Sequence, residues 1–270
     1  MSRRDSVFMC PPRFYGVEYV INPWMRGQIG RVNVRRARQQ WEALRRLVAA
    51  HTSVEIIEPV ASLPDMPFTA NAGLVFADSF VPARFLFPQR RPEAQHFTSW
   101  FSRRGYRILN LPGDGIFEGE GDALWQAHGR RLWCGYGIRT TRPAVGALAA
   151  LLGVSVIPLR LIDERFYHLD TCFCPLRDGA VLYYPGAFDP VSLDTIRAHV
   201  AADDRIEVSL DEALAFTCNA VAVNGTVITN RASERLRARL HERGYDVRTC
   251  EMSEFLRAGG SAKCLILTRS

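Results

Sequence analysis

The stretch AGGSAKCLIL, residues 258–267, places Cys264 between a turn rich in small residues and a short apolar run. A cysteine thiolate is a strong nucleophile, and glycines let the backbone bend closely around a reacting centre. A free cysteine is also one of the most commonly buried residues and then packs as a small hydrophobe. The stretch alone therefore fits either a nucleophile held on a shaped loop or an inert cysteine on a C-terminal strand.

Three other stretches carry acid–base groups at short spacing: FEGEGDALW, FYHLDTC and PDMPFTANAG. Their polar side chains are Glu118, Glu120, Asp122, His168, Asp170, Asp65 and Asn71. Residues two apart lie on one face of an extended segment, so His168 and Asp170 can face one cleft. Taken singly, each acid could cap a turn and the histidine could be structural. Together with a thiol, these groups are what nucleophilic catalysis on a cationic substrate requires.

The elements that would position these groups recur along the chain. Amphipathic helices are expected at 34–50, 92–105, 142–153, 192–202 and 232–244. Each is followed by a β-branched apolar run, typical of a strand, and then by a loop and a second apolar run. A third strand is expected at 84–88, 131–137, 180–186 and 225–230. The order of elements predicts an α/β protein built from five helix–strand–strand–strand modules.

Each second apolar run begins at a polar residue or cysteine, and we call these five positions the leading residues. They are Asn71, Asp122, Asp170, Asn219 and Cys264. Their regular spacing favours a ring of modules around one axis, in which the leading residues meet at one mouth. The fifth module lacks a third strand, and residues 7–21 can supply it and close the ring, which removes exposed sheet edges. Residues 1–270 would then form a single domain. The alternative is an ordinary α/β sheet with coincidental spacing.

Composition narrows the classes of partner. The chain has 34 basic and 28 acidic residues and a formal net charge of +6. Its arginines are dispersed over helical faces, and no recognised nucleic-acid motif accompanies them, so no nucleic-acid partner is expected.

No apolar run approaches the roughly 20 residues of a membrane span, and the N-terminus lacks the apolar core of a secretory signal. The seven cysteines show no CxxC spacing, so we expect a reduced, cytoplasmic protein without a metal site. A homo-oligomer is compatible with the sequence.

The motifs FEGEGD, HLD and GGSAKC, in this order and spacing, resemble those of the guanidino-group-modifying enzymes. These are arginine deiminases, dimethylarginine dimethylaminohydrolases, amidinotransferases and arginine dihydrolases, which share the five-bladed α/β propeller called the pentein fold. The resemblance covers nearly the whole chain. CPPRFYGVEYVINPWM, LPDMPFTANAGLVF and GYGIRT look particularly like the compact bacterial hydrolase and dihydrolase branch. The motifs are specific for the superfamily and less specific for the substrate.

The resemblance implies a role for each matching residue. Cys264 matches the nucleophile, His168 the general acid/base and Glu118 the acid that grips the guanidinium. EGEGD is one residue longer than the common EGGD, which leaves Glu120 as a rival to Glu118. Asp170 matches a second guanidinium carboxylate. The further residues expected to contact the substrate are Asn22, Asp65, Asn71, Arg90, Arg139 and Ser261, with Arg91 replacing Arg90 if the register shifts. Asp65 could instead cap its loop.

Asn71 lies where deiminases and many dimethylarginine hydrolases have an aspartate. An amide both donates and accepts hydrogen bonds, so it could hold a guanidinium first and a ureido group afterwards. The sequence therefore predicts an arginine dihydrolase, which converts L-arginine to L-ornithine through a covalent thiouronium without metal or organic cofactor. The alternatives are dimethylarginine or arginine hydrolysis to citrulline, and, more remotely, a non-catalytic ribosome-binding protein of the same fold. Asn71 could also merely stabilise a turn.

Overall fold

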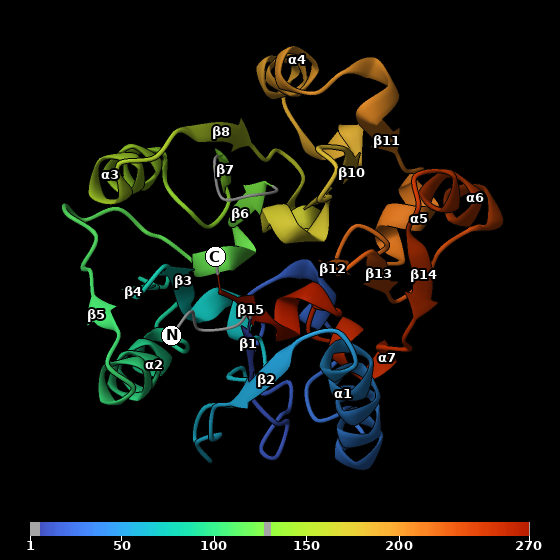
Figure 1. The fold of residues 1–270 in the computed structure, drawn as a ribbon. Helices are drawn as coiled ribbons and strands as arrows, with labels where there is room; N and C mark the ends of the chain where they lie inside the picture. The colour runs from blue at the N-terminus through green and yellow to red at the C-terminus, as the bar shows by residue number, and fades with distance from the viewer. Residues whose placement is uncertain (1–5, 127–130, 270) are drawn as a thin grey trace.

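Five three-stranded sheets surround a common axis in the computed structural model, which describes residues 6–126 and 131–269 (Figure 1). From inner to outer strand they are β15 (Leu267–Thr268), β1 (Ser6–Met9) and β2 (Ser53–Ile56); β3 (Gly73–Phe76), β4 (Ser79–Pro82) and β5 (Arg107–Ile108); β6 (Ala123–Gln126), β7 (Arg131–Tyr136) and β8 (Val156–Arg160); β9 (Phe173–Pro175), β10 (Val181–Tyr183) and β11 (Arg205–Glu207); and β12 (Val221–Val223), β13 (Thr226–Thr229) and β14 (Asp246–Thr249). Each inner strand pairs antiparallel with its middle strand, which pairs parallel with its outer strand. The predicted five-bladed α/β propeller is confirmed.

The first and last strands of the described chain belong to the same blade. β1 pairs antiparallel with β15, with Val7 opposite Thr268 and Phe8 opposite Leu267. On its other side β1 pairs in parallel with β2. The N-terminal strand thus closes the ring, as the sequence predicted.

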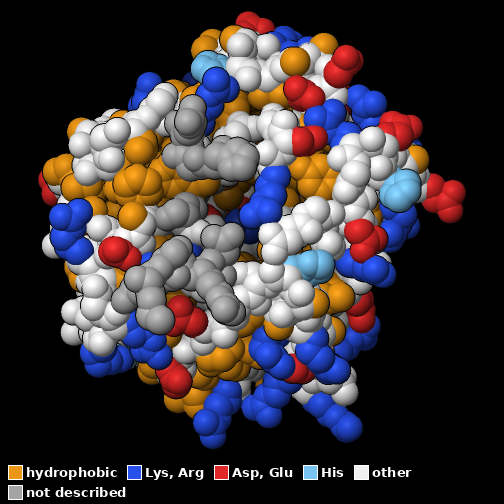
Figure 2. All heavy atoms as spheres, in the orientation of Figure 1, with side chains coloured by type: hydrophobic (Ala, Val, Ile, Leu, Met, Phe, Trp, Pro, Cys, Tyr) orange, Lys and Arg blue, Asp and Glu red, His pale blue; other side chains and the backbone are white. Residues whose placement is uncertain are grey.

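Helices cover the outside of the ring (Figure 1). They are α1 (Val34–Ala49), α2 (Arg91–Arg103), α3 (Arg142–Leu152), α4 (Pro190–His199), α5 (Leu210–Leu214), α6 (Glu234–Glu242) and α7 (Ser253–Leu256). In α1, Trp41, Leu44 and Val48 are buried at helical spacing, and the Asn33 side chain caps the first turn by accepting from the Arg36 amide at 3.0 Å. The arginines of α1 lie mainly on its outer side, and Figure 2 shows basic side chains gathered at that edge of the molecule.

The structure corrects three details of the predicted modules. The partner of β3 is residues 79–82 rather than the predicted 84–88, because a two-residue turn with Ala77 at φ 51° reverses the chain at once. In each blade the inner and middle strands come first, a long helix follows them, and the strand after that helix is the outer strand of the same sheet. The order within a blade is therefore strand, strand, helix, strand, and not the predicted helix, strand, strand, strand. The short helices α5 and α7 were not predicted, because one turn is too short to show periodicity.

Candidate active site

In the turns before the inner strands, three of the leading residues, Cys264, Asp170 and Asn219, are in direct contact, and the turn of Asn71 packs against the turn of Cys264. Short 3₁₀ turns hold Asn71 in η2 (Thr69–Ala72), Asp170 in η6 (Leu169–Thr171) and Cys264 in η9 (Lys263–Leu265). Asn219 precedes β12 and contacts both Cys264 and Asp170. Residues almost a hundred positions apart therefore meet at one end of the axis.

Cys264 is the sulfur at the centre of this cluster. Its side chain lies in the core of the ring, and the residue is only 2% exposed. Its Sγ lies 3.3 Å from Asp170 Oδ2 and 3.0 Å from Asn219 Nδ2. Burial, with the adjacent Asp170 carboxyl, raises the pKa of Cys264 well above its usual value. In this state Cys264 is a thiol that donates a hydrogen bond to Asp170 Oδ2.

His168 lies beside the acid predicted to accompany it. Its Nε2 is 2.7 Å from Glu118 Oε2, and the same oxygen accepts from Arg139 Nη1 at 2.8 Å. Burial alone would raise the pKa of Glu118, but the Arg139 guanidinium and the His168 ring outweigh it and hold this pKa below its usual range. Arg139 is sandwiched between the rings of Phe87 and Tyr167, at 4.6 and 4.7 Å. Glu118 is therefore an ionised carboxylate that orients the imidazole.

Asn71 links the imidazole to Arg90. Its Oδ1 accepts from Arg90 Nη1 at 2.8 Å, and its Nδ2 lies 3.4 Å from His168 Nδ1. An arginine can only donate, so the amide oxygen must face Arg90 and the amide nitrogen must face the ring. His168 Nδ1 is then the acceptor, and the ring proton lies on Nε2, toward Glu118. Arg90 is itself held by Glu93 at 2.8 and 3.0 Å.

The glycines of the EGEG turn explain how these groups approach so closely. Gly119 has φ +66°, a left-handed conformation that favours glycine. A Cβ on Gly121 would lie 2.3 Å from Asn71 Nδ2 and 3.3 Å from the His168 ring. Both positions therefore exclude a side chain.

The rival residues point elsewhere. Glu120 accepts from the Thr268 amide at 2.7 Å and pairs with Lys263 Nζ at 3.1 Å, away from His168. Arg91 donates to the backbone carbonyls of Phe85 and Leu86 at 3.3 and 3.0 Å. The structure thus brings Glu118 and Arg90, rather than Glu120 and Arg91, to the group formed by His168 and Asn71.

Three predicted site residues hold buried polar atoms without a hydrogen-bond partner among residues 6–126 and 131–269. They are Asp65 Oδ1, Asp170 Oδ1 and Ser261 Oγ. Buried polar atoms are nearly always hydrogen-bonded, so these three atoms, all at predicted substrate contacts, are groups that a polar ligand could satisfy. The other oxygen of Asp65 accepts from Tyr19 at 2.8 Å. Burial raises the pKa of Asp170 to about 7, although Lys263 opposes the shift.

The segment that leads into η1 (Pro23–Met25) covers the cluster. Asn22 caps this turn by accepting from the Trp24 and Met25 amides, and its Nδ2 donates to Ala258 O at 2.9 Å. Arg139 Nη2 donates to Ile21 O at 2.8 Å. Both side-chain polar atoms of Asn22 are thereby used, so its predicted contact with substrate would need a rearrangement of this segment.

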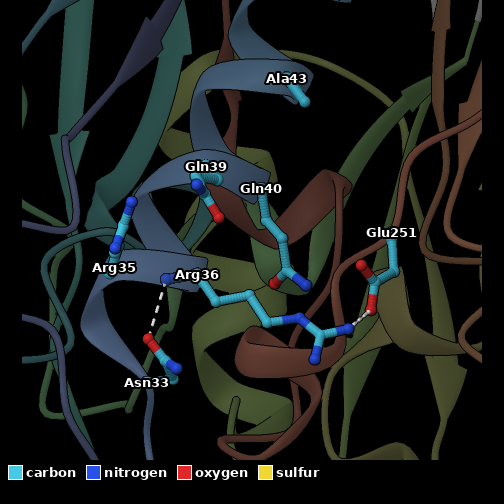
Figure 3. A pocket seen from close by; sticks show the side chains of 7 residues that line it. All are labelled: Asn33, Arg35, Arg36, Gln39, Gln40, Ala43 and Glu251. Atoms are coloured by element: carbon cyan, nitrogen blue, oxygen red, sulfur yellow. Dashed lines mark hydrogen bonds and ion pairs between the residues drawn. The ribbon is translucent and has the colours of Figure 1, made fainter.

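Other hollows lie away from this cluster. One of about 420 Å³ lies on the surface between α1 and the chain before α7 (Figure 3). Its charged side chains include an ion pair of Arg36 with Glu251. Within residues 6–126 and 131–269, no group of three His, Cys, Asp or Glu side chains is arranged to hold a metal ion, and no helix is long and apolar enough to cross a membrane.

Asn219 is the residue of this cluster that sequence reasoning did not assign to the site. Its signal was present in the repeat, because it is the leading residue of the fourth module. A lone amide suggests no chemistry by itself, and the contact with Cys264 spans 45 residues.

Comparison with known proteins agrees with this geometry. A family model described as "N,N dimethylarginine dimethylhydrolase, eukaryotic" matches residues 22–269. The N(G),N(G)-dimethylarginine dimethylaminohydrolase of Mycobacterium tuberculosis is 41% identical and covers 96% of this chain and 84% of that protein. The bifunctional arginine dihydrolase/ornithine cyclodeaminase AgrE of Nostoc sp. is 48% identical over 99% of this chain. The chain spans 38% of AgrE.

A solved structure resembles the chain equally closely. The N-terminal domain of ArgZ, an arginine dihydrolase from cyanobacteria crystallised with its substrate, has a TM-score of 0.96 and 46% identity, covering 98% of this chain and 97% of that one. The chain shares the fold of that domain, the five-bladed α/β propeller called the pentein fold. The chain belongs to the N,N-dimethylarginine dimethylaminohydrolase family.

Proposed function

We propose that the chain is a single catalytic domain that hydrolyses L-arginine to L-ornithine, two ammonia and carbon dioxide. The observation that carries the proposal is Asn71, an amide bonded to Arg90 and in contact with His168 Nδ1. A carboxylate there would only accept hydrogen bonds, which suits a guanidinium but repels a ureido oxygen. The similarity to AgrE and to ArgZ, both named as arginine dihydrolases, supports the same assignment.

The open acceptors suggest how the cationic substrate is held. Glu118 already accepts from Arg139, His168 and the Leu86 amide. Asp170 Oδ1 has no partner, so Asp170 supplies the main free acceptor for the guanidinium and Glu118 mainly orients His168. Arg90 and Arg139 are the cations available for the substrate α-carboxylate, once Arg139 exchanges its bond to Glu118.

The first half of the reaction forms and hydrolyses a thiouronium. A bound guanidinium stabilises negative charge on Asp170 and on the sulfur, which favours the Cys264 thiolate. The thiol proton passes to His168, the thiolate attacks the guanidinium carbon, the imidazolium so formed protonates the departing ammonia, and a thiouronium remains on Cys264. His168 then takes a proton from water, whose attack releases the thiolate and leaves a ureido group.

The second half repeats the same steps on the ureido carbon. Thiolate attack expels the second ammonia and leaves a thiocarbamate on the sulfur. Water releases this as a carbamate, which separates into ornithine and carbon dioxide. Two waters are consumed in total, and no metal or organic cofactor takes part. Asn71 can donate to the ureido oxygen in this half, which is the step an aspartate would oppose.

The competing function is hydrolysis of dimethylarginine to citrulline, because both the family model and the mycobacterial relative carry that name. Purified protein incubated separately with L-arginine and asymmetric dimethylarginine distinguishes the two, with products identified by mass spectrometry. Ornithine from arginine, absent with Cys264→Ser, supports the proposal. Citrulline from dimethylarginine, with little turnover of arginine, overturns it.

We further propose that the enzyme acts in the cytoplasm on a free small molecule and binds neither nucleic acid nor membrane. The seven cysteines are free and buried. A homo-oligomer is consistent with the chain. Gel filtration combined with light scattering tests the oligomeric state directly.

A further inference from the structure

The side-chain amide of Asn219 bridges the nucleophile and the neighbouring acid. Asn219 is 0% exposed. Its Nδ2 lies 3.0 Å from Cys264 Sγ and 3.0 Å from the backbone oxygen of Asp170. Its Oδ1 accepts from the Cys264 backbone amide at 3.2 Å. All three contacts are buried, so the amide is isolated from water.

Two backbone contacts fix which end of the amide faces the sulfur. The Asp170 carbonyl can only accept, so the group beside it must be the amide nitrogen. The Cys264 N–H can only donate, so the group beside that must be the amide oxygen. One N–H of Asn219 is then committed to Asp170, and the second is directed at Sγ. A flipped amide would lose both backbone bonds.

The backbone that presents Asn219 is also held firmly. Phe216, three residues earlier, has φ 58° and is buried, a left-handed conformation that costs a non-glycine residue of the order of 1–3 kcal/mol. The Lys263 amide donates to Asn219 O at 3.3 Å. Strain of this kind persists where surrounding contacts over-determine a conformation, as they do here around the sulfur.

We propose that Asn219 is a further catalytic residue, whose side-chain N–H stabilises the Cys264 sulfur as a thiolate during attack. The role rests on the proposed function only in taking Cys264 as the nucleophile. Before substrate binds, the thiol donates to Asp170 Oδ2 and accepts from Asn219. When the thiol proton has passed to His168 and Asp170 is ionised, the Asp170 carboxylate can only accept and no longer bonds the sulfur. The Asn219 side-chain N–H and the Ser261 backbone N–H remain as donors, in the position of an oxyanion hole but directed at the nucleophile.

The test is the pH dependence of Cys264 alkylation by iodoacetamide, followed by mass spectrometry of the Cys264 peptide. Asn219→Ala removes the donor, and Asn219→Asp keeps the shape and the acceptor for the Cys264 amide but places a carboxylate against Sγ. The native titratable groups near the thiol, Asp170, Tyr167 and Lys263, are kept in both variants, and Asn219→Asp adds one carboxyl of its own. Asn230→Ala is the matched control, because Asn230 also bonds two backbone groups beside the site, Ala215 O and the Met252 amide, without contacting Sγ.

Hydrogen bonds to charged groups imply that losing this donor shifts the alkylation midpoint upward by about one to two pH units and slows alkylation at pH 8 by roughly 10- to 100-fold. Asn219→Asp should shift it further than Asn219→Ala, and Asn230→Ala should behave as wild type. Wild-type midpoints in both Asn219 variants would overturn the proposal, as would an equal shift in Asn230→Ala.

A second measurement separates this role from general loosening of the loop. In a Cys264→Ala background, arginine should bind with the same Kd whether position 219 is Asn or Ala; a tenfold weakening would assign Asn219 to structure instead. Alkylation does not depend on turnover. If wild type fails to produce ornithine while the alkylation order still holds, the proposed function fails and the role of Asn219 stands.

Discussion

At the scale of single residues, the two acids of the site are in opposite electrostatic states. Glu118 lies against a guanidinium and an imidazole, whereas Asp170 faces a thiol and has one open oxygen. The first carboxylate is stabilised by its surroundings and the second is destabilised by burial. The same substitution, acid to amide, should therefore change stability in opposite directions at the two positions.

Asp170→Asn should stabilise the protein while abolishing turnover. Because burial raises the pKa of Asp170 to about 7, the folded state keeps this proton between about pH 4 and 7 while the unfolded state loses it. Stability therefore falls as pH rises through that window, by at most about 4 kcal/mol. The amide removes this decline, so calorimetry at pH 8 should show a Tm higher by roughly 3–6 °C. A lower Tm at pH 8 would contradict this assignment.

Glu118→Gln should destabilise the protein. The pKa of Glu118 is depressed, so its carboxylate contributes stability above the unfolded pKa of about 4.3, and this contribution is lost as pH falls toward the folded value. Removing the charge leaves the buried Arg139 without its ionic partner, which costs about 3–5 kcal/mol. Urea unfolding at pH 7 measures the loss. Equal stability of Glu118→Gln and wild type would show that Arg139 finds another partner.

At the scale of elements, the turn η3 (Gly119–Gly121) determines how closely Asn71 and His168 approach. Gly121→Ala would place a methyl group 2.3 Å from the Asn71 amide nitrogen. We expect kcat/KM for arginine to fall by about 100-fold, because a displacement of about an ångström at a catalytic group costs that much. Gly146→Ala in α3 is the control, since a Cβ there has nothing within 4 Å and should stabilise the helix by up to about 1 kcal/mol.

Steady-state kinetics and thermal unfolding of both glycine variants check this prediction. Full activity in Gly121→Ala would mean that the turn can shift without disturbing Asn71. Loss of activity in Gly146→Ala as well would point to general sensitivity of the fold rather than to contact at the site.

The boundaries of the helices and strands show which parts of the fold could be predicted from the sequence. The helices and most strands follow from apolar periodicity, as in α1, whose buried face includes Trp41 and Leu44. The strand β4 was misplaced because its turn uses Ala77 in a left-handed conformation, without the glycine or asparagine that usually signals it. The role of Asn219 could not be predicted for a different reason. The role of Asn219 depends on which atoms of Cys264 and Asp170 its side chain contacts, and the closed five-bladed ring determines those contacts.

At the scale of the whole molecule, closure of the ring depends on β1, which joins the first and last parts of the chain. Phe8 is fully buried and packs edge-on against Trp100, Phe101 and Tyr106. Phe8→Ala should cost about 3–5 kcal/mol of unfolding free energy. Leu210→Ala, at an exposed leucine, should change it by less than about 0.5 kcal/mol.

Urea unfolding followed by fluorescence and by circular dichroism measures both effects. Because β1 pairs with β15 and β2 together, the two probes should report one shared transition for the Phe8 variant. A Phe8→Ala protein as stable as wild type would show that the blade is held closed by other contacts.

The most direct test of the whole account follows the guanidino carbon of arginine. Wild-type protein is incubated with L-arginine labelled with ¹³C at that carbon, and the label is traced by NMR. A dihydrolase should deliver the label to carbon dioxide and bicarbonate, with one unlabelled ornithine for each label released and no accumulation of citrulline. Label that remains in citrulline as the end product would contradict the second hydrolysis and the role proposed for Asn71.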